Sequence, residues 1–203
     1  NDSMTLVIDD DASFGASGNA LRLGSSTATS TLRMQPGVAS VTINDGRLIT
    51  MRGDSNQVVQ VGRGSTLTIA GVIAGGTNTA ARTLTKADAG TLVLQNKNTY
   101  AGAATFSSSL VIRGGTLQLD SGSGSFTAAT DRFFADASNP LAIAFSAATG
   151  TFAGGGTLEI IQAVGNGFAL TQGFGNLTFN TGANTITLTN SSATQALNLN
   201  LGS

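Results

Sequence analysis

Apolar residues alternate with polar residues along most of the chain, and a period of two is typical of β-strands. The alternating segments are short, and Gly, Asn, Asp or Ser residues separate them. Many short strands joined by such turns predict an all-β fold. The expected strands lie at residues 4–8, 41–43, 48–51, 58–61, 67–69, 92–94, 110–112, 117–119, 141–143, 158–160, 177–179, 186–188 and 197–201.

One tetrapeptide pattern recurs within this series at a constant spacing. Thr-Leu-Thr-Ile at 66–69 is followed by Thr-Leu-Val-Leu at 91–94 and Thr-Leu-Gln-Leu at 116–119, so the first residues are 25 positions apart each time. Looser copies follow at roughly 17 to 24 residues, as expected of a structural repeat. These copies contain Leu141/Ile143, Leu158/Ile160, Leu177/Phe179 and Leu197/Leu199.

A repeat of this length fits one rung of a parallel β-helix, which contains two or three short strands and their turns. We therefore expect an all-β parallel β-helix, or β-solenoid, with rungs of roughly 17–25 residues, in which equivalent residues stack in columns. A β-sandwich or small barrel is the alternative, but the strands of a sandwich seldom repeat in sequence. The expected inward columns are Leu67, Leu92, Leu117 and Ile69, Leu94, Leu119, and the expected outward ladder is Thr66, Thr91, Thr116.

Residues 121–139 interrupt the repeat. A Gly-Ser stretch occupies 121–125, and Asp131–Asp136 predicts a short helical turn or a protruding loop. We interpret this segment as an insertion within a single solenoid domain that spans residues 1–203.

The amino-acid composition excludes most common types of catalytic site. The chain has 203 residues, no Cys, no His, a single Glu at Glu159 and only 10% charged residues. Disulfides, thiolate or imidazole metal ligands and Ser-His-Asp triads are therefore excluded. A net charge of −1 gives no electrostatic footprint for nucleic acid. No apolar run approaches the ~18 residues of a membrane-spanning helix. We expect no enzyme activity, no cofactor and no metal.

Three short motifs in the middle of the chain carry a family resemblance. The chain reads Leu-Thr-Lys at 84–86, Gly-Thr-Leu at 90–92 and Asn-Thr-Tyr at 98–100, and a closing strand follows at 112–119. This arrangement resembles the autotransporter-associated β-strand repeat, or passenger-associated repeat, of large bacterial surface and secreted proteins. The sequence departs from the family pattern at Asp88 and Ala89, where small residues or Gly are usual.

The resemblance implies a right-handed parallel β-helix in a secreted or cell-surface bacterial protein. In that family the repeat is structural, aids the export and folding of the passenger, and carries no catalytic activity by itself. We therefore expect a rigid extracellular fibre or passenger element. The chain starts at Asn-Asp-Ser without a signal peptide or an initiating Met, so we also expect a processed product or an internal fragment.

Some local motifs offer alternative functions. Arg52, Gly53 and Asp54 form an integrin-type tripeptide, for which a turn is the favoured interpretation and host-cell adhesion the alternative. Asp9–Asp11 presents three carboxylates of the kind that bind Ca²⁺, but consecutive residues seldom converge, which favours a solvated turn. The other carboxylates are too scattered to indicate a polysaccharide-cleaving site, and they include Asp45, Asp54, Asp88, Asp120, Asp131 and Asp136.

The chain ends keep two further functions open. A solenoid exposes unpaired strand edges at its ends unless these are capped. Either the chain is a slice of a longer rod and pairs with adjoining segments of that chain, or it is a filament subunit that stacks end to end. An adhesin or carbohydrate-binding module that uses loops 52–56 or 121–139 to bind a host surface or a glycan is the other. The candidate assembly strands contain Met4, Leu6 and Ile8 at one end and Leu197, Leu199 and Leu201 at the other.

Overall fold

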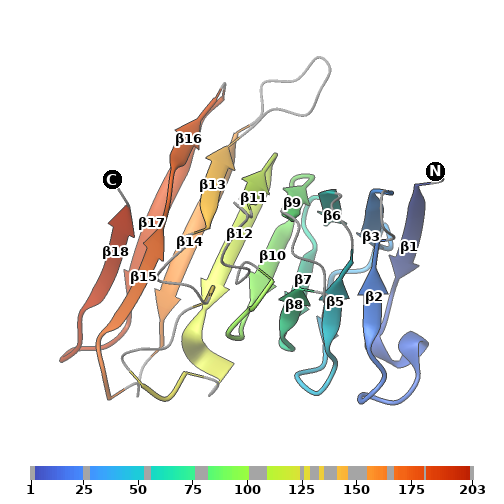
Figure 1. The fold of residues 1–203 in the computed structure, drawn as a ribbon, viewed down its shortest axis with the longest axis horizontal. Helices are drawn as coiled ribbons and strands as arrows, with labels where there is room; N and C mark the ends of the chain where they lie inside the picture. The colour runs from blue at the N-terminus through green and yellow to red at the C-terminus, as the bar shows by residue number, and fades with distance from the viewer. Residues whose placement is uncertain are drawn as a thin grey trace.

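Parallel strands stack along a single axis in the computed structural model of this chain (Figure 1). The structure describes residues 3–24, 28–52, 56–75, 82–100, 109–123, 126–128, 133–134, 141–145, 155–163, 167–180 and 182–201. Within these residues every pairing between named strands is parallel. The fold is therefore a β-solenoid, as the sequence repeat predicted.

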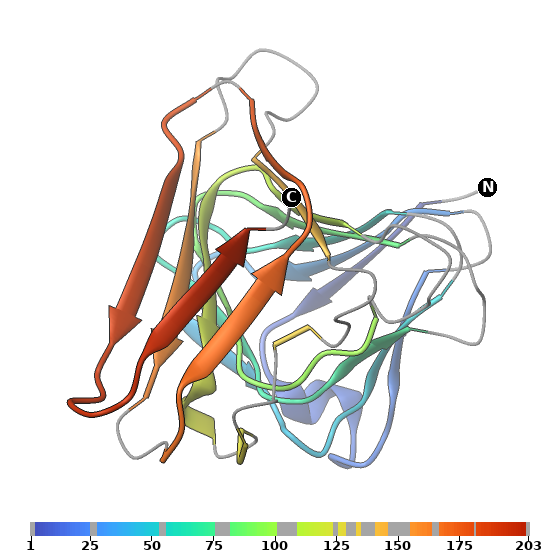
Figure 2. The same cartoon turned by 60° about the vertical axis from the view of Figure 1, so that its left-hand side comes forward.

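The strands form three faces around a common interior (Figure 2). The first face contains, in order, β1 (Met4–Ile8), β3 (Ser30–Met34), β6 (Asn56–Gln60), β9 (Thr83–Ala87), β11 (Ser109–Ile112), β13 (Ala142–Phe145) and β16 (Leu177–Phe179). The second face contains β4 (Ser40–Ile43), β7 (Thr66–Ile69), β10 (Thr91–Leu94), β12 (Gly115–Asp120), β14 (Gly156–Gln162) and β17 (Thr185–Asn190). The third face contains β2 (Leu21–Leu23), β5 (Ile49–Met51) and β8 (Ile73–Gly75), and later β15 (Leu170–Phe174) and β18 (Leu197–Leu201).

The predicted columns are confirmed on the second face. Thr91 pairs with Thr66 on one side and with Thr116 on the other, and the ladder continues to Thr157 and Thr185. The inward columns are closed to solvent, because Leu67, Leu92, Leu117, Ile69, Leu94 and Leu119 are all at most 1% exposed. Leucine and isoleucine side chains stacked in this way bury their apolar surface against the rungs above and below.

The length of a rung varies along the chain. Ile49 pairs with Ile73, a spacing that lies within the expected range, whereas Leu21 and its partner Ile49 are further apart in the sequence. The rung that contains the expected insertion is the longest of these, because Leu117 pairs with Leu158. The segment between these two leucines therefore lengthens one rung and leaves the stacking of the second face intact.

The looser copies of the repeat lie on different faces of the solenoid. Leu158 and Ile160 continue the inward columns of the second face. Ile143 and Phe179 lie on the first face instead, and Leu197 lies on the third. In the C-terminal half, strands that follow one another in the sequence thus occupy successive faces of one rung.

Strands β2, β3, β8, β9 and β15 were not predicted as strands. β2 and β8 contain only three residues each, and β3, β9 and β15 each bury at least one polar side chain. In β9, Thr85 and Lys86 are both fully buried, and in β15 Gln172 is 1% exposed. Buried polar residues of this kind conceal a strand from any pattern based on hydrophobicity.

Between β8 and β15, where the described residues form no third-face strand, side-chain amides continue this face. Asn98 forms an isolated parallel bridge with Phe134, and its Oδ1 accepts a hydrogen bond from the Ile73 backbone at 2.9 Å. On the next rung, Gln172 Oε1 accepts a hydrogen bond from the Phe133 backbone at 2.9 Å. Asn98 and Gln172 thus make bonds that a strand backbone makes elsewhere on this face.

The described part of segment 121–139 contributes aromatic side chains to the core. It begins with a short 3-10 turn, η2 (Ser121–Ser123). Phe126, Phe133 and Phe134 are each at most 3% exposed and belong to the core cluster. The helical turn or loop predicted at Asp131–Asp136 falls mostly on residues outside those described, and the extent of the domain over 1–203 stays a prediction.

Candidate functional site

The central repeat turns from the first face to the second through a corner that has no room for a side chain. A Cβ atom at Gly90 would overlap the carbonyl oxygen of Gly62, and one at Gly115 would overlap the carbonyl oxygen of Gly90. Gly115 also has a φ of +63°, which side chains disfavour. Both glycines directly precede a threonine of the ladder. The glycine of each Gly-Thr-Leu motif is therefore required because the corner packs closely against the corner of the previous rung.

The side chain of Lys86 lies inside the solenoid and forms hydrogen bonds with the backbone of the same corner. Its side chain is fully buried, and Nζ donates hydrogen bonds to the carbonyl oxygens of Ala87 at 2.7 Å and Asp88 at 2.6 Å. A third bond, to the carbonyl oxygen of Gly114 at 3.2 Å, reaches the corner of the next rung. Asp88 has a φ of +65°, so this lysine satisfies carbonyls in a backbone that departs from the strand conformation. Lys86 therefore connects two successive corners.

Asn98 and Tyr100 fix the end of the repeat. Asn98 is fully buried, accepts the bond from Ile73 and donates through Nδ2 to the carbonyl oxygen of Asn96 at 2.9 Å. Tyr100 is fully buried and packs edge-on against Phe134, with ring centroids 5.7 Å apart. Burial raises the pKa of the Tyr100 phenol well above its usual range. Its hydroxyl has no hydrogen-bond partner in the described part of the chain, so the ring acts by packing.

We expect Asn98→Ala to lower the free energy of unfolding by about 2 kcal/mol, because it leaves the buried Ile73 N–H without an acceptor. Urea unfolding followed by circular dichroism measures the change. The exposed Asn200, on the edge strand β18, is the matched control, and Asn200→Ala should change the stability by less than about 0.5 kcal/mol. Equal losses for the two variants would contradict the bridging role of Asn98.

The stability of the protein should rise between about pH 8 and pH 10. Burial lowers the pKa of Lys86 from 10.5 to about 8, and the nearby Asp88 carboxylate opposes this shift only in part. In this window the unfolded chain retains the lysine proton and the folded chain has released it, so stability increases with pH. Lys86→Met should flatten this rise in urea unfolding measured at several pH values. A rise of equal slope in the variant would show that Lys86 does not cause it.

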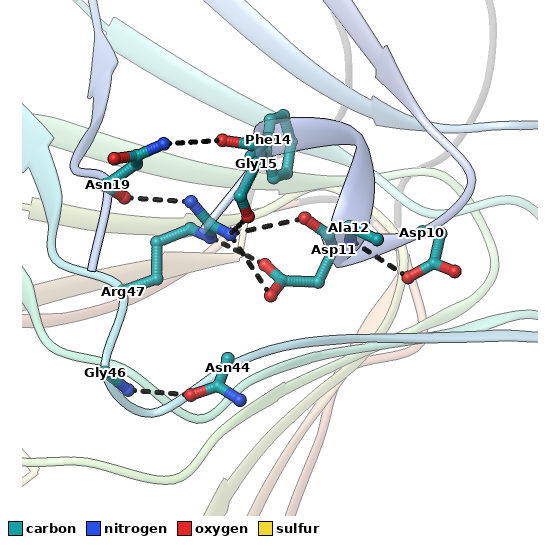
Figure 3. Close-up of polar contacts among 9 residues, drawn as sticks. All are labelled: Asp10, Asp11, Ala12, Phe14, Gly15, Asn19, Asn44, Gly46 and Arg47. Carbon is teal, nitrogen blue, oxygen red and sulfur yellow. Dashed lines mark hydrogen bonds and ion pairs between the residues drawn. The ribbon is translucent and has the colours of Figure 1, made fainter. Parts of the chain in front are cut away.

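The first corner of the solenoid contains a cluster centred on Arg47, a residue that the sequence did not single out (Figure 3). Arg47 is 1% exposed, and its Nε lies 2.6 Å from Asp11 Oδ1. The guanidinium also donates to the carbonyl oxygens of Asn19 at 2.9 Å and Gly15 at 3.0 Å. Its centre lies 5.2 Å from the centre of the Phe14 ring. The buried guanidinium of Arg47 thus binds the segment that follows β1 to the turn that follows β4.

This cluster depends on a short 3-10 helix, η1 (Asp11–Phe14), which takes the place of a second-face strand in the first rung. Asp10 caps the helix by accepting a hydrogen bond from the Ala12 backbone at 3.1 Å. No local pattern indicates Arg47, because its partner Asp11 is 36 residues away and a single arginine after an Asn-Asp-Gly turn is typical of solvated loops.

The three predicted acidic residues do not converge. Asp9 accepts a hydrogen bond from Ser13 Oγ at 3.0 Å, Asp10 caps η1 and Asp11 pairs with Arg47, so each carboxylate has its own structural contact. Among the residues that the structure describes, no three Asp or Glu side chains lie close enough to hold a metal ion. The possibility of a calcium site at Asp9–Asp11 therefore gains no support from the geometry.

The other predicted site residues are only partly described. Arg52 is exposed at the end of β5, whereas Gly53 and Asp54 lie outside the described residues, so adhesion through this tripeptide stays a prediction. Of the candidate assembly residues, Met4 is 60% exposed and Leu201 is 50% exposed, and Ile8 is buried. Leu6, Leu197 and Leu199 are partly buried against the core.

Comparison with known proteins gives one informative result. A family model described as the passenger-associated-transport-repeat matches residues 84–119. No curated protein and no solved structure gave a match. No helix among the described residues has the length and hydrophobicity needed to cross a membrane. The matched segment contains Lys86, Gly90, Asn98, Tyr100 and Gly115, the residues that form the corner and the bridge described above. Residues 84–119 are therefore similar to the passenger-associated-transport-repeat family, in agreement with the resemblance found in the sequence.

Proposed function

We propose that this chain is a structural element of a secreted or surface-exposed bacterial passenger protein: a stiff rod that has no catalytic role. The proposal rests on what the residues of the matched segment, 84–119, contact in the structure. Gly90, Gly115, Lys86 and Asn98 all serve the stacking of one rung on the next. These contacts lie inside the solenoid. The residues that define the repeat therefore have a structural role, which is to hold neighbouring rungs together.

The distribution of carboxylates supports a function without catalysis. Asp120 accepts hydrogen bonds from the Gly122 backbone at 2.9 Å and from Gln95 Nε2 at 3.1 Å. Glu159 Oε1 accepts a bond from Thr189 Oγ1 on the neighbouring strand at 3.3 Å. Asp120 and Glu159 lie on the adjacent strands β12 and β14, and each accepts hydrogen bonds from neighbouring groups of the scaffold, as expected of carboxylates with a structural role.

The adhesin and carbohydrate-binding alternatives gain less support. Glycan-binding grooves usually present exposed aromatic rings, but Tyr100 and Phe126, Phe133, Phe134, Phe145 and Phe174 are all buried. Phe179, at the end of the solenoid, is the one described phenylalanine with more than half of its surface exposed. An aromatic platform along a side of the rod is therefore absent from the described residues.

Surface display tests the proposal. The chain is fused to the translocating barrel of a bacterial autotransporter, and the displayed fraction is measured by protease treatment of whole cells. The wild-type chain and Gly62→Ala, which meets no neighbouring atom, should be displayed alike. Gly90→Ala should be displayed poorly, because export is expected to depend on folding of the solenoid outside the cell. Equal display of all three chains would contradict a role of the folded repeat in export.

A further inference from the structure

A tight turn at residues 44–47 joins β4 to β5 and exposes an aspartate that is followed by a glycine. The Arg47 backbone N–H donates to the carbonyl oxygen of Asn44 at 3.0 Å and closes the turn. Asp45 and Gly46 are both exposed, and they form the only Asp-Gly pair of the sequence. Because glycine has no side chain, its own residue does not shield the backbone nitrogen from the carboxyl group of the preceding aspartate.

This pair of residues can rearrange with water as the only other reactant. The backbone nitrogen of Gly46 attacks the side-chain carboxyl carbon of Asp45, the nitrogen's proton leaves with the carboxyl OH as one molecule of water, and a five-membered succinimide ring forms. Water then adds to the main-chain carbonyl carbon of Asp45, and the bond from this carbon to the Gly46 nitrogen breaks. The main chain now runs through the former side chain, so the residue is an isoaspartate and the total mass is unchanged.

The side chain of Asn44 opposes this reaction in the folded chain (Figure 3). Its Oδ1 accepts a hydrogen bond from the Gly46 backbone N–H at 3.0 Å. The nitrogen must release this proton before it bonds to carbon, and the hydrogen bond stabilises the unreactive N–H form. The same bond and the one from Arg47 to Asn44 also fix the backbone on both sides of Asp45. Attack therefore requires the turn to open locally.

The folded turn has no room for the product. Isoaspartate adds one carbon atom to the main chain between Asn44 and Arg47. The backbone of Gly71, on the next rung, packs against this turn, because a Cβ atom there would overlap the carbonyl oxygen of Arg47 and lie 3.0 Å from that of Asn44. The Arg47 guanidinium is in turn buried and bound to Asp11. A longer turn therefore has to displace Arg47 from these contacts.

We propose that Asp45 is a site of spontaneous isomerisation to isoaspartate, that Asn44 slows this reaction while the turn is folded, and that the product releases the Arg47 cluster. The modification needs no enzyme. It limits the lifetime of the first corner of the solenoid and does not depend on the function proposed above.

The rate of isoaspartate formation in the purified chain tests the site and its protection. Samples aged in the folded state and in urea are digested, and mass spectrometry with electron-transfer fragmentation measures the fraction of isoaspartate at residue 45. The wild type should react several-fold faster in urea than when folded. Asn44→Ala should accelerate the reaction several-fold in the folded state and leave the rate in urea unchanged. Gly46→Ala should nearly abolish the reaction, because its Cβ fits the folded turn, 3.5 Å from Asn44 Oδ1, and shields the nitrogen.

Two further variants separate the hydrogen bond from a general loss of structure. Asn44→Asp keeps an acceptor oxygen and should leave the folded-state reaction slow. Asn200→Ala replaces an exposed asparagine on β18 and should not change the rate. Equal rates for folded Asn44→Ala and wild type, or equal acceleration by Asn44→Asp and Asn44→Ala, would show that this bond does not protect the turn. Absence of isoaspartate at residue 45 of the wild type in urea would overturn the site itself.

The stability of the modified chain tests the release of the Arg47 cluster. The isoaspartate form is separated from the unmodified form by chromatography, and it should unfold at a lower urea concentration. Arg47→Ala should cost much less stability in the isoaspartate form than in the unmodified form, since the modification has already displaced the guanidinium. An isoaspartate form that unfolds together with the unmodified chain, or an undiminished effect of Arg47→Ala, would contradict this release.

Discussion

Replacement of Arg47 by alanine should lower the free energy of unfolding by about 3 kcal/mol, one of the two largest losses that we expect for a single substitution. Removal of one partner from a largely buried ion pair leaves the other charge poorly compensated. In this cluster the loss also includes the bonds to the carbonyl oxygens of Asn19 and Gly15 and the contact with Phe14. The Asp11 side chain is 17% exposed, so water can solvate part of the charge that is left.

Urea unfolding at neutral pH measures this effect, and Arg33→Ala is its matched control. Arg33 is exposed on β3, and its replacement should change the stability by less than about 0.5 kcal/mol. Arg47→Lys should recover only part of the loss, because an ammonium group cannot reproduce the planar set of donors of a guanidinium. A loss below about 1 kcal/mol for Arg47→Ala would contradict the role of Arg47 in holding η1 against the turn that follows β4.

Gly90→Ala should destabilise the solenoid by about 3 kcal/mol or more, or prevent folding altogether. The added Cβ would overlap the carbonyl oxygen of Gly62 and lie 2.8 Å from that of Ser65. Both contacts involve backbone, which cannot rotate away as a flexible side chain does. Relief therefore requires the two rungs to separate at the corner, with loss of packing in the columns that begin there.

Thermal unfolding of the Gly90→Ala and Gly62→Ala variants tests this corner. Gly62 has no atom within 4 Å of an added Cβ, so alanine at 62 should leave the stability unchanged or raise it slightly through the lower entropy of the unfolded chain. The two substitutions are chemically identical and lie at successive corners. Equal stability of the two variants would therefore show that the corners are not packed as closely as described.

The sequence predicted the fold where each rung repeats with a constant length. Thr66, Thr91 and Thr116 are equally spaced in the sequence, and this spacing predicted the column of threonines that the structure confirms. In the C-terminal half this regularity is lost, because the segment between Leu117 and its partner Leu158 makes one rung much longer than those before it. Without a constant rung length, the distance between two strands does not reveal whether they share a face.

The candidate sites were predicted less completely, because their residues act through contacts that are remote in the sequence. Lys86 was visible as part of a family motif, but its burial and its bond to Gly114 depend on the neighbouring rung. Arg47 and Gln172 are polar residues in segments without a motif, and their roles arise from Asp11 and Phe133, which are 36 and 39 residues away. Hydrophobic periodicity assigns such residues to the surface, whereas full hydrogen bonding allows them to be buried.

Disulfide formation between engineered cysteines tests the stacked register most directly, because the natural chain contains no cysteine. Neighbouring rungs are separated by about 4.8 Å, within the range that a disulfide spans. Thr66→Cys/Thr91→Cys and Thr91→Cys/Thr116→Cys should therefore form disulfides under mild oxidation. Thr66→Cys/Thr116→Cys spans two rungs, about 9.6 Å, and should stay reduced. Failure of both adjacent pairs, or equally rapid oxidation of the pair that skips a rung, would contradict the β-solenoid.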